Sequence, residues 1–566
     1  MIIEKIEQII KESFNKAGYD IESIKVIKSN RPDLCDYQCD DVFKLTKLYH
    51  QNPIEIGEKI VNELNNYENF SDYFEKIEFV KPGFINITVS NTFINEYLKQ
   101  MASNIKNILN IPEKKETFVV DFGGANVAKP LHVGHMRTIL VGESVSRIIR
   151  FFGHKTIGDV HLGDYGLQIG QVIYGILRDG KTIDDIDIKY LDTIYPQMSG
   201  ICKEDEEIKA KCAEITKQLQ DGNEEYTKLW KKILEVSVQD IKKNYDYLGA
   251  NFDLWLGESD SYKYLEQLEK QFNDKGILTE SEGAIIVNVS KSEDKKEVPP
   301  LLFKKSNGAY LYASTDLATI LQRKEDFNPD HILYVVDSRQ ALHFEQVFRA
   351  SDLGELMPYS SLEHLGYGTV NGEDGKPYKT RNGDNPKLEG LFETAREIFI
   401  SKKESNKDMP REDVDKIVNS ILKFADLQNS RDKDYIFDLN KFSDVSGKTG
   451  PYILYTYLRI NKILKEENID LTLTNNIYNK FDRDLRIKML DYIDAVNTAF
   501  YERKPNYIAE YVYNLCVACN IFYQNNHIAN MEDKINKNDW LYVLNISNKI
   551  IKEMLYLLGI EIPSMM

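Results

Sequence analysis

Apolar and polar residues recur with different periods along the chain, and these periods predict which segments form helices and which form strands. Residues 1–20 place isoleucines at helical spacing among charged residues, which predicts an amphipathic helix. Residues 84–89 show a strand-like alternation after the turn Lys81-Pro82-Gly83, as expected of a half-buried strand. The first unit of the chain is therefore expected to be a small α+β domain.

A second pattern starts with a short apolar run at residues 117–122, which halts at Gly123-Gly124. A long amphipathic stretch from Met136 to Phe152 follows, so this segment predicts a strand, a glycine-bearing loop and a helix. Further strand candidates lie at residues 284–289 and 332–336, among helical stretches. That arrangement is typical of a mostly parallel sheet covered by helices on both faces.

The rest of the chain is expected to be largely helical. Residues 181–250 are rich in charge and predict a helical insertion, while helical periodicity dominates from about residue 408 onward. The chain is too long for one hydrophobic core. Three domains are predicted: an α+β domain at 1–112, an α/β domain at 113–407 and a helical bundle at 408–566.

Composition narrows the class of protein. With 42% hydrophobic and 28% charged residues, the chain matches ordinary globular proteins. No signal peptide is expected, and no apolar run approaches the roughly 18 residues that cross a bilayer. Six cysteines in 566 residues are too few for a disulfide scaffold and favour a reducing compartment, the cytoplasm. No matching ligand pairs accompany the close cysteines, so no structural metal is expected.

The net charge of −17 argues against a nucleic-acid partner when it is taken alone. Net charge does not say where the basic residues lie, however, and one local basic patch is enough to contact phosphates. A nucleic-acid partner therefore stays open at this point.

The strongest chemical signal is His132-Val133-Gly134-His135, which lies where the loop gives way to the amphipathic helix. In open α/β sheets, ligands bind beyond the carboxyl ends of the strands, and a helix start attracts phosphates. Two imidazoles can both donate hydrogen bonds to a triphosphate, and Gly134 leaves room for a flat base. A pair of exposed capping histidines is the alternative interpretation.

Residues 125–135, Ala-Asn-Val-Ala-Lys-Pro-Leu-His-Val-Gly-His, resemble the ATP-binding signature of class I aminoacyl-tRNA synthetases in its arginyl form. Four further blocks resemble that family in the same order: His161 to Gly166, Tyr334 to Gln340, Lys379 to Gly383 and Gly447 to Tyr452. The resemblance implies a Rossmann-like catalytic domain between an N-terminal tRNA-contacting domain and a helical anticodon-binding domain. It implies a monomer with no membrane partner.

The resemblance implies that ATP binds to Lys129, His132, Gly134 and His135 together with Lys379, Thr380 and Arg381 of a mobile lysine-rich loop. That loop departs from the Lys-Met-Ser-Lys form, and Lys129 supplies the missing positive charge. Attack of a carboxylate on the α-phosphate builds negative charge on pyrophosphate. Lys129, Lys379, Arg381 and Mg²⁺ are expected to stabilise it, with His132 and His135 completing the catalytic set.

A guanidinium substrate requires carboxylate acceptors. Tyr312 and Asp316 are four residues apart, so they project from one face of a helix, and Asp121 ends the first strand of the α/β domain. The resemblance implies that L-arginine contacts six side chains: Asp121, Asn126, His161, Tyr312, Asp316 and Gln340. Gln168 is expected in the same pocket. Packing on a helix is the alternative for Tyr312 and Asp316.

The resemblance also implies that Phe84 stacks on a base of tRNA(Arg) and that Asn86 hydrogen-bonds to one. A buried position in the strand is the alternative for Phe84. The implied reaction forms arginyl-adenylate and then transfers arginine to the 2′-hydroxyl of the terminal ribose, with activation dependent on bound tRNA.

Three rival functions are weighed against this one. A class I synthetase of cysteinyl or glutamyl specificity is disfavoured by the N-terminal extension and the paired acids. A small nucleotidyltransferase would not need the helical C-terminal third. A non-catalytic tRNA-binding paralogue is disfavoured because Lys129, His132 and His135 are all present.

Overall fold

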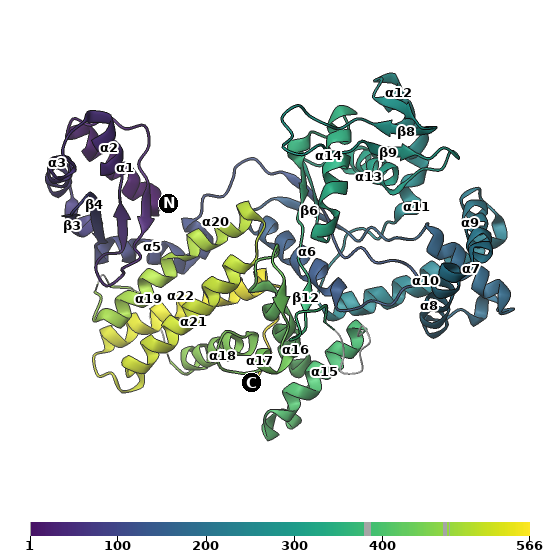
Figure 1. Ribbon diagram of the computed structural model, residues 1–566. Coiled ribbons are helices and arrows are strands. Elements are labelled where there is room, and N and C mark those ends of the chain that lie inside the picture. Colours follow the sequence, from purple (N-terminus) through teal and green to yellow (C-terminus); the bar gives the residue numbers. More distant parts are fainter. Residues whose placement is uncertain (1, 379–386, 468–472, 475) are drawn as a thin grey trace. The chain divides into compact units, whose positions relative to one another are not determined.

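The computed structural model describes residues 2–378, 387–467, 473–474 and 476–566 of the chain (Figure 1). The chain divides into two compact units. The first combines residues 1–111 with residues 455–497 and 511–554. The second combines residues 112–454 with 498–510 and 555–566. The expected helical C-terminal third, residues 408–566, is therefore shared between the two units.

The first unit contains a four-stranded antiparallel sheet of order β1-β2-β4-β3, which confirms the predicted α+β region. Strand β4 (Phe84–Val89) buries Ile85, Ile87 and Val89 completely, so its alternation separates a core face from the face that carries Phe84 and Asn86. Its other elements before residue 112 are α1 (Ile2–Lys16), β1 (Val26–Lys28), β2 (Tyr37–Cys39), α2 (Val42–Tyr49), α3 (Pro53–Asn65), α4 (Phe70–Tyr73), β3 (Phe74–Val80) and α5 (Asn91–Ser103).

Helix α19 (Lys480–Leu490) packs within this unit against α5, although almost 400 residues separate them in the sequence. Arg486, which is fully buried, donates to Asn95 Oδ1 at 2.6 Å and pairs with Asp482 at 2.7 Å. The buried charges are thus matched locally, as interior ion pairs require.

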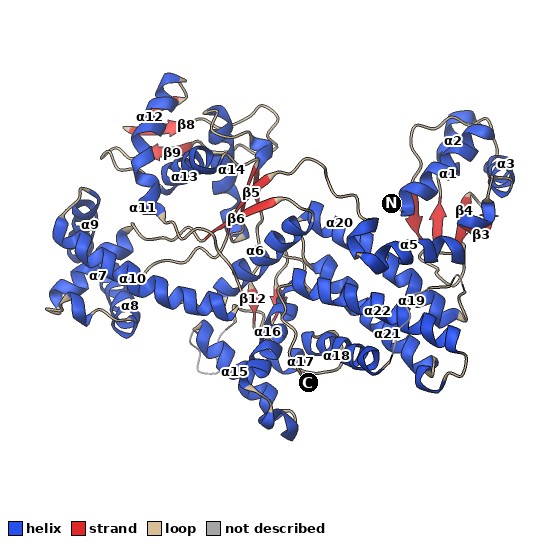
Figure 2. Ribbon diagram, turned by 180° about the vertical axis from the view of Figure 1, so that it is seen from behind, coloured by secondary structure: helices blue, strands red, loops and turns tan. Residues whose placement is uncertain are grey.

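A parallel sheet of order β11-β10-β5-β6 forms the centre of the second unit, as predicted for the α/β region. Strands β5 (Thr117–Asp121), β6 (Lys155–Asp159) and β10 (His331–Tyr334) end at neighbouring positions, because Asp121 is in register with both Asp159 and Tyr334. Figure 2 shows β5 and β6 side by side. The carboxyl ends of these strands therefore open toward one region, where ligands bind in such folds.

Helices cover this sheet. The predicted helix after β5 is α6 (Gly134–Phe151), and α13 (Tyr312–Phe327) and α14 (Ala341–Leu353) contribute to one apolar core with Val119 and Ile332. Strand β11 (Leu362–His364) completes the edge.

The prediction that residues 284–289 belong to the parallel sheet is wrong. Strand β8 (Ala284–Val287) lies in a separate antiparallel sheet with β7 (Leu278–Ser281) and β9 (Leu301–Lys304). Only Glu282 and Gly283 connect β7 to β8, with φ of 50° and 79°. A two-residue turn with positive φ joins antiparallel neighbours, whereas parallel strands need a long crossover.

The charged insertion is helical, as predicted. It comprises α8 (Ile188–Glu204), α9 (Glu206–Gln220) and α10 (Glu224–Tyr247), which pack together with α7 (Leu167–Arg178). Further elements of the second unit are α11 (Glu258–Ser261), α12 (Leu265–Asp274), β12 (Val370–Asn371), α15 (Leu388–Ser401), α16 (Arg411–Leu427), β13 (Tyr435–Ile436) and α17 (Leu439–Phe442).

The last part of the chain is helical, as the periodicity predicts. Its long helices are α18 (Gly450–Glu466), α20 (Tyr492–Glu502), α21 (Asn506–Asn525) and α22 (Lys534–Leu557). Among the described residues, no helix combines the length and the apolar character needed to span a bilayer.

Candidate active site

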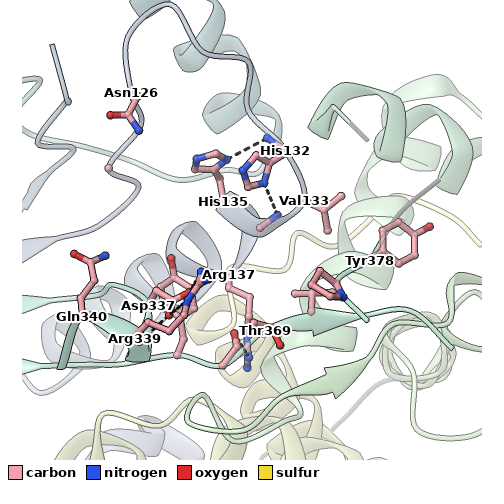
Figure 3. Close-up of a pocket in the computed structure, with 16 residues that line it drawn as sticks. Asn126, His132, Val133, His135, Arg137, Asp337, Arg339, Gln340, Thr369 and Tyr378 are labelled. Atoms are coloured by element: carbon pink, nitrogen blue, oxygen red, sulfur yellow. Dashed lines mark hydrogen bonds and ion pairs between the residues drawn. The ribbon is translucent and has the colours of Figure 1, made fainter. Parts of the chain in front are cut away.

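A cavity of about 510 Å³ lies at the carboxyl end of the parallel sheet in the second unit (Figure 3). Its walls come from the loop after β5, the start of α6, the segment after β10 and the strand β12. The lining includes five of the residues singled out in the sequence: Asn126, His132, Gly134, His135 and Gln340. The strand-loop-helix pattern therefore leads to a real concave site.

The backbone fixes the tautomers of the two histidines. Nδ1 of His132 accepts from the N–H of Gly134 at 3.0 Å, and Nδ1 of His135 accepts from the N–H of His132 at 3.1 Å. A neutral imidazole that accepts at Nδ1 carries its proton on Nε2. Each ring can therefore donate one hydrogen bond through Nε2, and the ring centroids lie 4.0 Å apart.

Both imidazoles are neutral at physiological pH. Burial, with smaller effects from His132 and Lys129, lowers the pKa of His135 to about 3. Burial and the charge of Lys129 likewise lower the pKa of His132. The pair can therefore donate hydrogen bonds to an anion without carrying a positive charge of its own, and Lys129 is a nearby cation.

Gly134 is needed for packing as well as for access. A Cβ at this position would lie 2.8 Å from Cε1 of His132, so a side chain would displace the first imidazole. The position of the His132 ring in the histidine motif therefore requires a residue without a side chain at position 134.

Lys129 does not line the cavity, although its charge reaches both histidines. The residue before it, Ala128, has φ of 64°, a left-handed conformation that side chains disfavour. The N–H of Ala128 donates to Ser237 Oγ of α10 at 3.0 Å, which holds the loop in this conformation. Strained backbone of this kind is often found at functional sites.

Gln340 lies beside a pair that the sequence did not single out. Asp337 and Arg339 line the cavity and pair at 2.6 Å, and this hydrogen bond lowers the pKa of Asp337. Arg339 is largely exposed, with a side-chain exposure of 83%. It is therefore a cation at the mouth of the site.

A group of acidic residues lies outside the cavity lining. Asp316 accepts from His343 Nε2 of α14 at 2.6 Å, and this contact raises the pKa of His343 against the opposing effect of burial. Burial raises the pKa of Glu258 to about 8, with the charges of Asp316 and Asp164 adding to the effect. Glu258 in turn raises the pKa of Tyr312, after the larger effect of burial. Tyr312 and Asp316 therefore share their surroundings with a second carboxyl group.

Asp121 is buried among protein charges and does not line the cavity. Nη2 of Arg323 donates to Asp121 Oδ2 at 2.6 Å and to Asp159 Oδ2 at 2.7 Å. The two carboxylates end neighbouring strands, so one buried guanidinium pairs with both. The structure thus directs the Asp121 carboxylate to an internal arginine, which sequence spacing could not reveal.

His161 lies on the loop after β6, and Gln168 lies at the start of the following helix, α7. His161 has φ of 44°, and its Nδ1 is buried with no hydrogen-bond partner among the described residues. Gln168 donates to the carbonyl of Gly163 at 3.3 Å. Neither residue lines the cavity.

The expected ATP-binding residues Lys379, Thr380 and Arg381 lie outside the described residues. The chain on either side of them borders the site. The N–H of Tyr378 donates to the carbonyl of Val370 on β12 at 3.0 Å, and the N–H of Leu388 donates to Leu131 at 3.0 Å.

Phe84 and Asn86 lie in the first unit, on one face of β4. Phe84 is half-buried and makes an edge contact with Phe43, with ring centroids 5.4 Å apart. Asn86 Oδ1 accepts from Gln38 at 2.8 Å. Because the core face of the strand carries other residues, Phe84 is not part of the central strand core.

Sequence reasoning missed Glu258, Asp337, Arg339 and His343. Asp337 and Arg339 had a usable signal, since both lie in the family block Tyr334 to Gln340, which begins where strand β10 ends. Glu258 follows the helical insertion without any periodic pattern, so only the fold brings it to Asp316.

Comparison with protein-family models gives three matches. The model described as "tRNA synthetases class I (R), catalytic domain" matches residues 97–439. The model "Arginyl tRNA synthetase N terminal domain" matches residues 2–89, and "DALR anticodon binding domain" matches residues 453–566.

Similar full-length proteins include the arginine–tRNA ligase of Alkaliphilus oremlandii, 38% identical over 589 residues that span 100% of both chains. The arginine–tRNA ligase of Agathobacter rectalis is 38% identical over 598 residues, again across 100% of both chains. The crystal structure of Plasmodium falciparum arginyl-tRNA synthetase matches with a TM-score of 0.82 and 25% identity, and covers 100% of this chain and 99% of that one.

Proposed function

The chain belongs to the class I arginyl-tRNA synthetase family, and from this premise we propose how its residues bind ATP and arginine. The chain is an arginine–tRNA ligase, which charges tRNA(Arg) with arginine at the expense of ATP. The cavity at the start of α6 is the proposed ATP site. The observation that carries this proposal is the pair of Nε2–H donors that the backbone orients in His132 and His135.

We assign the triphosphate to His132, His135 and the nearby charge of Lys129. Preorganised donors stabilise charge that develops during reaction, because they need no rearrangement when it forms. Gly134 leaves the surface beside the imidazoles open for the nucleotide. Lys379, Thr380 and Arg381 stay proposed ATP contacts on the strength of the sequence alone.

We propose that Mg²⁺ binds in the cavity together with ATP. Among the described residues, no three histidine, cysteine, aspartate or glutamate side chains lie together as a metal-binding group. Magnesium commonly takes most of its ligands from phosphate oxygens and water, with one or two carboxylates. Asp337 is the carboxylate that lines the cavity within the described part of the chain.

The arginine side chain is assigned to Asp316, Glu258 and Tyr312. Two carboxylates can accept the paired N–H donors of a guanidinium, and Asp316 is held in place by His343. Asn126 and Gln340 line the cavity and are assigned to the α-amino and carboxyl groups of the substrate. Asp121 and His161 do not line the cavity, and we assign them a supporting position next to the proposed arginine site. Asp121 acts there through its contact with Arg323.

In the proposed first step, a carboxylate oxygen of arginine attacks the α-phosphorus, and the bond to pyrophosphate breaks. The arginyl group then passes to the 2′-hydroxyl of the terminal ribose, and AMP leaves. No side chain acts as a covalent nucleophile, since orientation and charge stabilisation can carry both steps. Phe84 and Asn86 are the proposed tRNA contacts of the first unit, and the protein is proposed to act as a cytoplasmic monomer.

The test is pyrophosphate exchange with each amino acid in turn, with and without tRNA(Arg). Exchange that needs arginine and depends on tRNA is the expected result. Exchange with a different amino acid would reject the assigned arginine pocket.

A second experiment examines the guanidinium contacts. Replacing Asp316 by Asn removes one charge and is expected to weaken arginine binding by roughly 10- to 100-fold, the range for losing a hydrogen bond between charged groups. The KM for ATP should stay within about twofold. Asp326→Asn, at an exposed position of the same helix, is the matched control. An unchanged KM for arginine in Asp316→Asn removes this residue from the pocket.

A further inference from the structure

Two segments that are distant in sequence form opposing walls of the ATP cavity. One wall is the start of α6, with His132, Gly134 and His135, and the other contains Tyr367, Thr369 and Val370 at the beginning of β12. The shape of the cavity depends on how these walls are held together.

Arg137 lies on α6 two residues after the second histidine, lines the cavity and contacts the other wall. Its Nη1 donates to the carbonyl of Gly368 at 2.8 Å and to the carbonyl of Lys433 at 2.8 Å. Gly368 precedes β12, and Lys433 precedes β13, its parallel partner. One guanidinium nitrogen therefore joins α6 to both strands of this pair. Figure 3 shows Arg137 reaching toward Thr369.

The charge of Arg137 is matched within the same contact. Asp426 of α16 lies 3.2 Å from its Nε, and both side chains are only 1% exposed. The guanidinium lies over the ring of Tyr435, 5.1 Å from the centroid, and the Tyr435 hydroxyl donates to Asp426 at 2.9 Å. A buried cation that is paired, stacked and hydrogen-bonded is held in a defined position.

The two strand segments are also too close for a side chain between them. A Cβ on Gly368 would lie 2.6 Å from the carbonyl carbon of Lys433 and 2.7 Å from the N–H nitrogen of Asp434. The close approach brings both carbonyls within reach of the same nitrogen. Gly368 therefore permits the close approach of the two segments, and Arg137 holds them together through its hydrogen bonds.

We propose that Arg137 is a positioning residue that fixes β12 against the histidine-bearing start of α6 and so sets the affinity for ATP. The proposal rests on the assignment of the cavity to ATP. Arginine binding should be affected less, because the proposed guanidinium contacts Asp316, Glu258 and Tyr312 lie outside this cavity and only the proposed backbone contacts of the substrate, Asn126 and Gln340, line it. A residue needed only for folding would instead lower the amount of active enzyme and leave both KM values unchanged.

The experiment compares the wild type with Arg137→Lys and Tyr435→Phe by steady-state pyrophosphate exchange. Lysine keeps the charge beside Asp426, but a single ammonium cannot reproduce the planar contacts of a guanidinium. The KM for ATP is expected to rise roughly 10- to 100-fold in Arg137→Lys, the range for hydrogen bonds to a buried charge. A smaller rise is expected in Tyr435→Phe, which loses only the hydroxyl contact to Asp426. The KM for arginine should change by less than about threefold.

The matched control is Arg486→Lys, a fully buried and ion-paired arginine of the first unit. It should lower the unfolding temperature without raising the KM for ATP. If Arg137→Lys does not fold, Tyr435→Phe carries the test alone. An unchanged KM for ATP in the folded variants, or equal rises in both KM values, would overturn the proposal.

Titration of each variant with a fluorescent ATP analogue separates this inference from the proposed function. Weaker nucleotide binding in Arg137→Lys supports the positioning role even if exchange with arginine fails in the wild type. Nucleotide binding equal to that of the wild type overturns it.

Discussion

Single hydrogen bonds decide what the residues of this site can do. His132 and His135 are neutral, and backbone N–H groups occupy their Nδ1 atoms, so each presents a donor at Nε2. At the acidic group, the opposite situation holds. Burial, with a smaller effect of the charges of Asp316 and Asp164, raises the pKa of Glu258 to about 8 and so favours the protonated carboxyl at neutral pH.

Arginine affinity is therefore expected to depend on pH through Glu258. Its pKa is about 8 in the free protein, and a bound guanidinium favours the ionised carboxylate. Binding then releases a proton, and affinity should rise by up to about tenfold per pH unit between pH 6.5 and 8. Calorimetric titration of arginine in buffers of different ionisation enthalpy measures both the affinity and the proton release.

Glu258→Gln is the control for this prediction, since its affinity for arginine should be lower and nearly independent of pH in this range. The stability of the free protein provides a separate check on the pKa of Glu258. This pKa is about 8 in the folded protein, above the ordinary value of 4.5. The contribution of Glu258 to the stability of the fold is therefore fully present at low pH and is lost as the pH rises toward 8. The difference in unfolding temperature between Glu258→Gln and the wild type should therefore grow from pH 6 to pH 8.5. A pH-independent difference would contradict the assignment.

Helix α6 is the element on which the proposed ATP site depends. It starts at Gly134 and packs closely on the chain that leaves β5, because Gly142 has no side chain facing Phe122. A Cβ at Gly142 would lie 2.2 Å from Cγ of Phe122. The position of the histidines thus depends on packing two turns further along the helix.

Gly142→Ala should destabilise the protein by roughly 1–3 kcal/mol, because the Phe122 ring must move and the core is overpacked. Denaturant unfolding measures this change. Gly200→Ala is the matched control, at an exposed position inside α8 where a Cβ meets nothing within 4 Å. Alanine there should instead stabilise the helix by about 0.5–1 kcal/mol. Equal effects of the two substitutions would show that packing at Gly142 is not limiting.

At the scale of the molecule, the first unit is assembled from both ends of the sequence. Arg483 of α19 donates from Nη1 and Nη2 to the two carboxylate oxygens of Asp36, each at 2.8 Å. Its Nη2 also donates to the carbonyl of Val89 at 2.9 Å, at the end of the strand that carries Phe84. The sheet with the proposed tRNA contacts and this helix therefore form one structural unit.

Arg483→Gln should lower the stability of the first unit by about 2 kcal/mol, as expected when hydrogen bonds to a charged partner are lost. Hydrogen exchange is expected to accelerate in β4 and α19 while β5 and β6 keep their protection. Arg31→Gln, which breaks the exposed ion pair with Asp33 in the same unit, is the control and should have little effect. Faster exchange in β5 and β6 as well would indicate global unfolding instead.

The sequence by itself determined the fold class, the strands β4, β5 and β10, several long helices, and the place of the histidine motif. These depend on local periodicity and on order along the chain, which tertiary contacts rarely override in long amphipathic segments. The histidine motif itself pointed to His132, Gly134 and His135, and the resemblance to class I synthetases implied Asn126 and Gln340; all five line one cavity.

Only the tertiary structure decided which partner each charged group has. Asp121 ends a strand as expected, yet Arg323 from α13 binds it together with Asp159, the carboxylate that ends the neighbouring strand. Glu258 meets Asp316, and Arg137 meets Lys433, across more than 50 residues of sequence in each case. The pattern of residues along a chain does not encode such pairings, since they depend on how separate elements pack in space.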